Sequence, residues 1–129
     1  MKLEEGMYVR TKYGEIARID ECKGKDKVYK NMEHYETDRM VTKFNNFILY
    51  KEDISKASHN IIDLIEVGDI LILDLWQHEN SKQVVYEADD IKVIYMYDMH
   101  IPITNDEIVI KSILTKEQFE SMSYKVGEE

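Results

Sequence analysis

The chain has 129 residues, of which 43% are hydrophobic and 33% are charged, and it carries a net charge of −9. This composition excludes a disordered chain and predicts a packed interior. The sequence contains no apolar stretch of the roughly 18 residues that a membrane-spanning helix needs, and its start lacks the apolar run of a secretory signal. We therefore expect a protein that stays in the cytoplasm and does not contact membranes.

The charge is distributed unevenly along the chain. Residues 1–64 contain 12 basic and 12 acidic side chains, whereas residues 65–129 contain 5 basic and 14 acidic ones. Because Lys and Arg contacts to phosphate supply most non-specific affinity for nucleic acid, the second half is expected to repel nucleic acid and attract a basic partner. Solubility alone is the simpler explanation of the same excess.

The first half reads as a series of short strands. Residues 7–11 and 15–19 are rich in strand formers, and Gly14 in the connection between them predicts a tight hairpin. A charged loop is expected over residues 21–27, followed by strands over 28–35 and 44–50 that are joined by a polar connection. Residues 60–64 predict a single helical turn, capped by Ser58 or Asn60, that bridges the two halves.

The second half also reads as strands, with one helix at its end. Residues 70–76 are almost continuously apolar, which predicts a central strand buried on both faces and returning through residues 84–86. Apolar residues at every second position from Ile91 to Ile101 predict one long strand. The string Thr115–Gln118 predicts a capping box, and the helix expected near 116–122 has Phe119 and Met122 on one face.

Each half opens on a similar string that contains a glycine. Leu3–Val9 and Ile65–Leu71 align at an offset of 62 residues, with identities at Glu and Gly only. Gly6 and Gly68 are both expected to turn the chain into a first strand. Shared turn chemistry and a true duplication both explain the match. We expect two modules, residues 1–64 and residues 65–129.

Three segments carry a resemblance to a known group of proteins. Residues 6–16, 58–69 and 113–122 resemble segments of small uncharacterised proteins of phages and prophages of Gram-positive bacteria. The segment 6–16 is also similar to the opening of SH3-like barrels of the KOW type. The resemblance implies SH3-like barrel-type halves. Because halves of about 60 residues are marginal as independent folds, we expect a mainly β fold of two such small halves that share a core, with the short C-terminal helix. Barrels of this type often bind nucleic acid, but the basic, aromatic face used for such binding is missing from residues 40–50.

No complete catalytic, cofactor-binding or metal-binding set emerges from the residue types. Asp98 and His100, with Asp106 or Glu107, would suit a divalent cation or a general acid–base pair, and an exposed polar strand face explains them equally well. Cys22 lies between Glu21 and Lys23, whose effects on its pKa oppose each other, and it is interpreted as structural or incidental.

We therefore expect a non-enzymatic accessory protein that binds a host protein with a basic surface, such as a nucleic-acid-handling defence protein. The expected contact residues are acidic or lie beside acidic groups in the second half: Asp89, Asp90, Met96, Asp98, His100, Asp106 and Glu107. The alternative is an SH3-like module that binds nucleic acid through the lysines of a loop at Lys23–Lys30.

Overall fold

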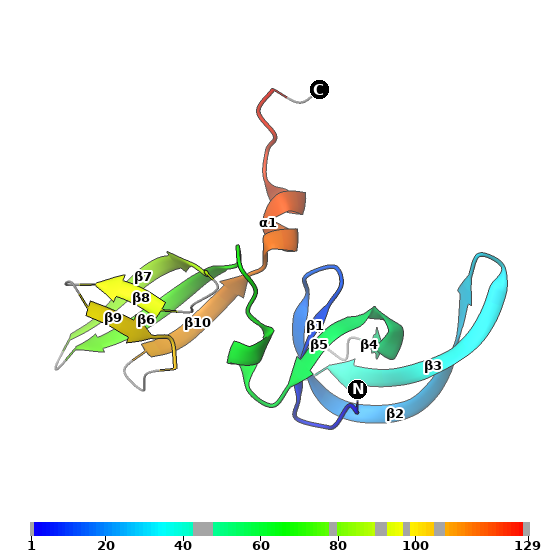
Figure 1. The fold of residues 1–129 in the computed structure, drawn as a ribbon. Helices are drawn as coiled ribbons and strands as arrows, with labels where there is room; N and C mark the ends of the chain where they lie inside the picture. The colour runs from blue at the N-terminus through cyan, green and yellow to red at the C-terminus, as the bar shows by residue number, and fades with distance from the viewer. Residues whose placement is uncertain are drawn as a thin grey trace. The chain divides into compact units, whose positions relative to one another are not determined.

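The computed structural model describes residues 2–42, 48–77, 80–89, 93–96, 99–104 and 108–127. It confirms the expected class, because the protein is mainly β with one short helix near its C-terminal end (Figure 1). The chain divides into two compact units, unit 1 (Met1–Leu64) and unit 2 (Ile65–Glu129). That the two halves are barrels sharing a core stays a prediction.

Unit 1 is built on a five-stranded antiparallel sheet with the order β4-β3-β2-β1-β5. Its elements are β1 (Tyr8–Thr11), β2 (Ile16–Lys30), β3 (Glu33–Thr42), β4 (Ile48–Tyr50), η1 (Lys51–Asp53), β5 (Ile54–Ser58) and η2 (Ile61–Leu64). The core comes from the strands and comprises Val9, Ile19, Met40, Leu49 and Ile54. The expected hairpin of β1 and β2 is confirmed, and so is the helical turn, in which the Asn60 side chain accepts a hydrogen bond from the Ile62 amide.

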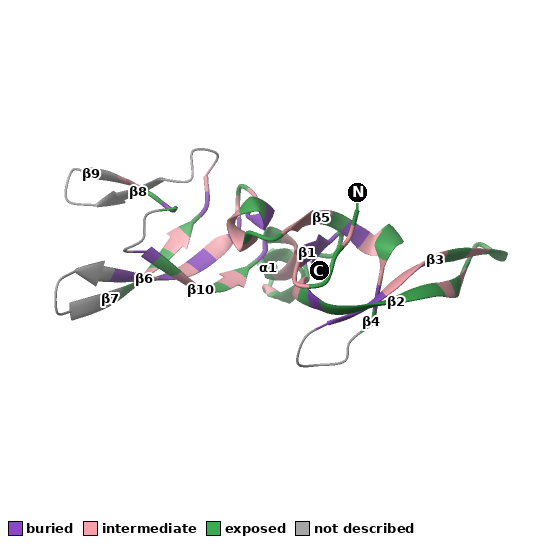
Figure 2. Ribbon diagram, turned by 90° about the horizontal axis from the view of Figure 1, so that it is seen from below, coloured by how far each residue is buried: buried purple, intermediate pink, exposed green. Residues whose placement is uncertain are grey.

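The expected charged loop over residues 21–27 is wrong, because β2 continues through it as one strand (Figure 1). From Gly24 to Lys30, β2 pairs only with β3, and the chain reverses at Asn31 and Met32. Two bulges, next to Ile19 and next to Cys22, interrupt the register of this pair, and bulges bend and twist a strand. Among residues 20–39 whose burial is described, none is buried and all are exposed or half-buried (Figure 2).

Unit 2 contains a three-stranded sheet with the order β10-β6-β7 and a separate two-stranded hairpin. Its elements are β6 (Ile70–Gln77), β7 (Asn80–Glu87), β8 (Val93–Met96), β9 (Met99–Pro102), β10 (Ile108–Leu114) and α1 (Lys116–Met122). The central place of β6 is confirmed, but its burial on both faces is wrong. Leu71, Leu73 and Leu75 are buried, whereas Ile70 and Ile72 at the alternate positions are only half-buried, so the second face of β6 is less covered than the first.

The single long strand expected from Ile91 to Ile101 is also wrong. β8 and β9 are two strands that pair antiparallel, with Met96 opposite Met99 and Tyr95 opposite His100. In a hairpin with this register, directly opposed positions share a face, so positions of the same parity fall on opposite faces of the two strands. The unbroken alternation of the sequence therefore favoured one strand and carried no signal of the reversal.

Both units open on the same hydrogen-bonded turn. In unit 1 the Met7 amide donates to the Glu4 carbonyl (3.3 Å), and in unit 2 the Asp69 amide donates to the Glu66 carbonyl (3.1 Å). Gly6 and Gly68 occupy the third position of these turns with φ of 86° and 96°, which favours glycine.

The match extends to the bonds that join each turn to a neighbouring strand. The amide of Gly6 donates to the Ile19 carbonyl (2.8 Å) and the Ile19 amide donates to the Met7 carbonyl (2.8 Å). In unit 2, Gly68 donates to Ala88 (3.0 Å), and Ala88 donates to Asp69 (2.8 Å). Each turn is therefore held by the same pair of bonds, to a residue of the second strand in unit 1 and to the residue just after the second strand in unit 2.

The first and last strands of each unit also pair in the same register. Tyr8 lies opposite Ser58 in unit 1, and Ile70, its counterpart at the offset of 62, lies opposite Leu114. Each pair of strands contains one bulge. In unit 1 the bulge is at Ser55, which lies between the residues paired with Arg10 and Thr11. In unit 2 it is at Lys111, which lies between the residues paired with Ile72 and Leu73. A helical segment, η2 or α1, follows the last strand in both units.

Candidate functional site

The start of α1 is fixed by a buried carboxylate from the Gly68 turn. Asp69 is fully buried, and its side chain accepts hydrogen bonds from the Glu66 amide (2.8 Å) and the Lys116 amide (3.0 Å). Because the first amides of a helix have no partner within the helix, a carboxylate there satisfies a donor and interacts favourably with the helix dipole. The turn and the helix are thereby joined.

The expected capping box at the same end of α1 is confirmed. The buried Thr115 side chain accepts from the Gln118 amide (3.4 Å), and the Gln118 side chain accepts from the Thr115 amide (3.1 Å). An ion pair between Lys116 and Glu66 (2.8 Å) adds a further link to the turn. Four contacts thus hold the helix start, which sets the direction of the helix.

The rest of α1 is not covered by the described part of unit 2. None of its residues is buried, and Phe119 and Met122 are 51% and 78% exposed. Tyr124 and Val126, in the segment that follows, are exposed as well. The sequence indicated a helix face with Phe119 and Met122, but its open position depends on packing and is visible only in the structure.

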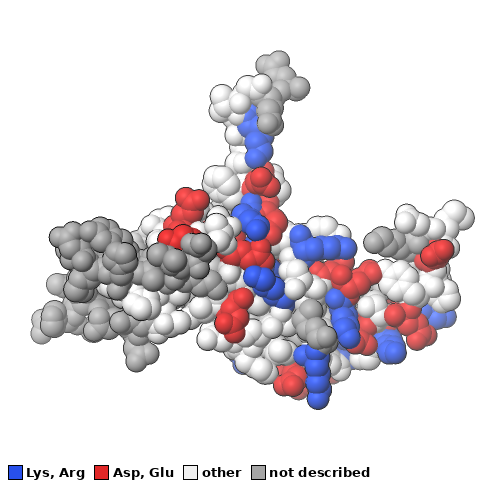
Figure 3. Space-filling view, viewed as in Figure 1, with Lys and Arg blue, Asp and Glu red and all other residues white. Residues whose placement is uncertain are grey.

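Two lysines of unit 2, one on β10 and one at the helix start, are engaged with carboxylates. Lys111 pairs with Asp74 (3.4 Å) and Lys116 with Glu66. Other acidic residues of this unit, among them Glu87 and Glu120, are exposed. In unit 1, by contrast, acidic and basic side chains are interspersed over the surface (Figure 3).

Three of the seven expected contact residues lie among the described residues of unit 2. Asp89 is half-buried just after β7, Met96 ends β8 and His100 lies in β9. The remaining four, which are Asp90, Asp98, Asp106 and Glu107, lie outside the described residues. That these seven residues form one contact surface stays a prediction.

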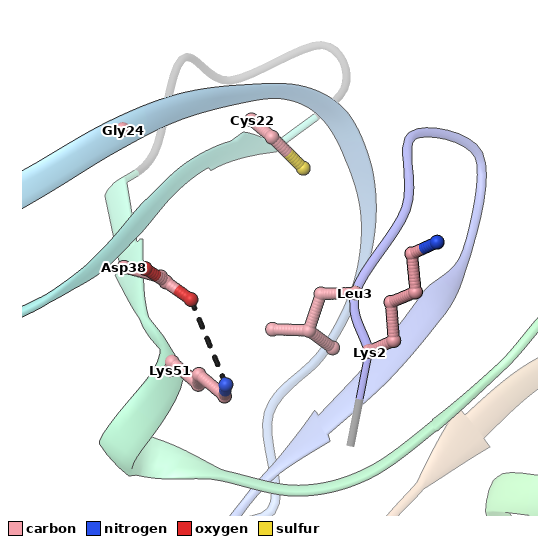
Figure 4. A pocket seen from close by; sticks show the side chains of 6 residues that line it. All are labelled: Lys2, Leu3, Cys22, Gly24, Asp38 and Lys51. Carbon is pink, nitrogen blue, oxygen red and sulfur yellow. Dashed lines mark ion pairs between the residues drawn. The ribbon is translucent and has the colours of Figure 1, made fainter.

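A pocket of about 500 Å³ lies in unit 1 (Figure 4). It is lined by Lys2, Leu3, Cys22, Gly24, Asp38 and Lys51. Its polar wall contains an ion pair between Lys51 and Asp38 (3.6 Å). Partial desolvation, followed by the carboxylates of Glu5 and Asp38, raises the pKa of the Cys22 thiol, so the thiol stays protonated at neutral pH and is a weak nucleophile.

The lysines of β2 lie opposite acidic residues of β3. In the register of the hairpin, Lys25 faces Asp38, Lys27 faces Glu36 and Lys30 faces Glu33. Opposite charges at facing positions of an antiparallel pair stabilise the hairpin and neutralise each other. This pairing weakens the field that phosphate binding through Lys23–Lys30 would need.

Within the described part of the chain, no three His, Cys, Asp or Glu side chains come together as a metal site would require. The helices of that part are also too short or too polar to cross a membrane.

Comparisons with protein-family models, with curated proteins and with solved structures returned no match for this chain.

Proposed function

We propose that this chain is a non-enzymatic accessory protein, of the kind that phages encode, and that unit 2 binds a basic surface of a host protein that handles nucleic acid. The observation that carries the proposal is the charge difference between the units: residues 1–64 are neutral, and residues 65–129 hold the whole net charge of −9. Carboxylates presented by unit 2 would occupy the positions that phosphates take on such a partner.

Two features of the structure support a role for this charge beyond solubility. The lysines at the helix start and on β10 are engaged with Glu66 and Asp74, so they do not offset the acidic residues elsewhere in unit 2. The excess is also confined to one compact unit, whereas a solubility role would be served equally by charge spread over both.

The proposal is tested by salt titration with a partner recovered from host lysate at low salt and then purified. Raising the salt from about 50 to 300 mM should weaken binding steeply, because salt screens the attraction between the acidic surface of unit 2 and a basic surface of the partner. Replacing Asp89 and Asp90 together by Asn should weaken binding at low salt. Glu15→Gln, which removes an acidic charge from unit 1, is the control and should leave binding unchanged. Binding that is insensitive to salt would exclude the proposal.

Nucleic-acid binding through Lys23–Lys30 is the alternative, and the facing acidic residues of β3 argue against it. A shift of labelled oligonucleotides at low salt that is lost when Lys23, Lys25 and Lys27 are replaced together would favour this alternative.

A further inference from the structure

The pocket of unit 1 has two walls of different chemistry. One wall is formed by Leu3, which packs against the buried core of this unit, and by Cys22, whose protonated thiol behaves as a small apolar group. The other wall carries Asp38 and Lys51, a carboxylate beside an amine (Figure 4). With about 500 Å³, the pocket has the size of sites that hold small molecules. It therefore suits a small ligand with an apolar part and a charged part.

The charged groups of the second wall do not saturate each other. The Lys51 amine lies 3.6 Å from the Asp38 carboxylate, which is longer than a hydrogen bond between charged groups, and each side chain is 45% exposed. An ammonium donates several hydrogen bonds and a carboxylate accepts several, so both groups keep capacity for a ligand. An exposed pair of this kind contributes little to stability, and a ligand can enter between its members at little cost.

The pair selects against a ligand with a single charge. An anion that approaches Lys51 is repelled by Asp38, and a cation that approaches Asp38 is repelled by Lys51. The carboxylates of Glu5 and Asp38 both act on the Cys22 thiol, so the field on that side favours the positive end of a ligand. An α-amino acid carries an ammonium and a carboxylate on the same carbon atom, and this arrangement matches two opposite charges placed side by side.

The walls of the pocket are held in place within unit 1. The hairpin of β2 and β3 forms one wall and is tied to the neighbouring elements, because Tyr35 of β3 donates a hydrogen bond to Glu52 of η1 and Tyr50 of β4 donates one to Asp26 of β2 (3.2 Å). The bulge next to Cys22 bends β2 at this wall, and bulges are frequent beside active sites because they redirect side chains. A pocket that is formed in advance lowers the ordering cost of binding.

We propose that the pocket of unit 1 binds a free α-amino acid with an apolar side chain, such as leucine. The ammonium of the ligand contacts Asp38, its carboxylate contacts Lys51, and its side chain lies against Leu3 and Cys22. Gly24 leaves room for the ligand, because a side chain at this position of the pocket would extend into open space. The inference concerns unit 1 alone and is independent of the function proposed for unit 2.

Calorimetric titration of the full-length chain tests which parts of the ligand are needed. Leucine should bind in the micromolar to millimolar range, as expected for a ligand of few atoms. Leucinamide lacks the carboxylate and N-acetylleucine lacks the ammonium, so each should bind at least about ten-fold more weakly. Glycine keeps both charges but has no apolar side chain, and it should also bind at least about ten-fold more weakly. Failure of leucine to bind at about 10 mM, or equal affinity for leucine and any of these analogues, would overturn the inference.

Variants of the polar wall locate the charged end of the ligand. Lys51→Met and Asp38→Asn should each weaken leucine binding at least about ten-fold. Lys12→Met is the matched control, because Lys12 pairs with Asp53 (3.2 Å) away from the pocket lining and is as exposed as Lys51. It should bind leucine within about two-fold of the wild type, and circular dichroism verifies that all variants are folded, as expected after the loss of an exposed ion pair. Wild-type affinity of Lys51→Met would refute the assigned contact and with it the inference.

The thiol of Cys22 shows whether leucine occupies this pocket. Cys22 is the only cysteine of the chain and is exposed, so its alkylation by iodoacetamide can be followed by mass. Saturating leucine should slow the alkylation, whereas glycine at the same concentration, which carries the same reactive amine, should leave the rate unchanged. An unchanged rate with bound leucine would place the binding site elsewhere and overturn the inference.

Discussion

Replacement of Asp69 by Ala should destabilise unit 2 more than any other change of a single surface or turn residue. The carboxylate accepts two amide hydrogen bonds, and a hydrogen bond to a charged group contributes about 1.5–3 kcal/mol. Loss of a favourable charge at the helix start adds about 0.3–1 kcal/mol. We expect the free energy of unfolding to fall by at least about 3 kcal/mol.

The size of this loss can be compared with the stability of the unit. A unit of this length has a total stability of roughly 3–10 kcal/mol, so Asp69→Ala would remove a major part of it. Asp69→Asn keeps one acceptor oxygen and should lose about half as much, roughly 1.5–3 kcal/mol. Thr115→Ala, which removes only the cap, should cost about 1 kcal/mol.

Urea denaturation followed by the fluorescence of Trp76 measures these losses, since Trp76 is the only tryptophan of the chain and lies in β6. Glu87→Gln, an exposed change at the end of β7, is the control and should alter stability by less than about 0.5 kcal/mol. A loss below about 1 kcal/mol for Asp69→Ala would refute the conclusion that this carboxylate fixes α1 to the turn.

Three further changes test other parts of the structure. Met32 is fully exposed at the hairpin tip with φ of 68°, so Met32→Gly should stabilise unit 1 by up to about 1 kcal/mol in thermal unfolding, and a loss of stability would contradict this strain. Gly6→Ala and Gly68→Ala should each cost about 1–2 kcal/mol, and unequal costs would argue against equivalent turns. The pH midpoint for alkylation of Cys22 by iodoacetamide should lie above that of free cysteine, because a raised pKa leaves less thiolate at each pH. Asp38→Asn should lower this midpoint. A midpoint equal to that of free cysteine would refute the raised pKa.

Local signals in the sequence predicted the features that depend on a few neighbouring residues. The capping box at Thr115, the turns at Gly6 and Gly68 and the cap at Asn60 each require only residues within one turn. Features that depend on distant partners were predicted less well. β2 reads as a charged loop because the acidic residues that face its lysines come from β3, after the reversal at Asn31.

The candidate site shows the same limit. The sequence indicates the acidic excess of residues 65–129 and the apolar face of α1, because both are patterns of residue types. It does not show that Phe119 is open to solvent, since this depends on what the rest of the chain covers. Nor does it reveal Asp69 as the anchor of α1, because the bond to Lys116 joins residues far apart in the chain.

The similarity between the two units could come from shared turn chemistry or from duplication, and its extent distinguishes these two origins. Turn chemistry alone explains why Glu4–Met7 and Glu66–Asp69 form similar turns, because glycine at the third position favours that conformation. It does not explain the bulges in the last strand of each unit. Ser55 bulges opposite Arg10 and Thr11, and Lys111 bulges opposite the positions that correspond to them at the offset of 62. These strands lie more than 40 residues further along the chain, outside the reach of local conformational preference. The shared register therefore favours duplication over turn chemistry.

Duplication also explains where the units should differ in function. The shared elements, which are the turn, the strand pairings and the bulge, are needed for folding in both units and leave little scope for specialisation. The differences lie outside them: unit 1 carries the exposed hairpin of β2 and β3, whereas unit 2 carries the acidic excess and the open face of α1. In unit 1 the helical segment after the last strand is covered, so the same position has a structural role there. The segment after the last strand is therefore partly buried in unit 1 and exposed in unit 2.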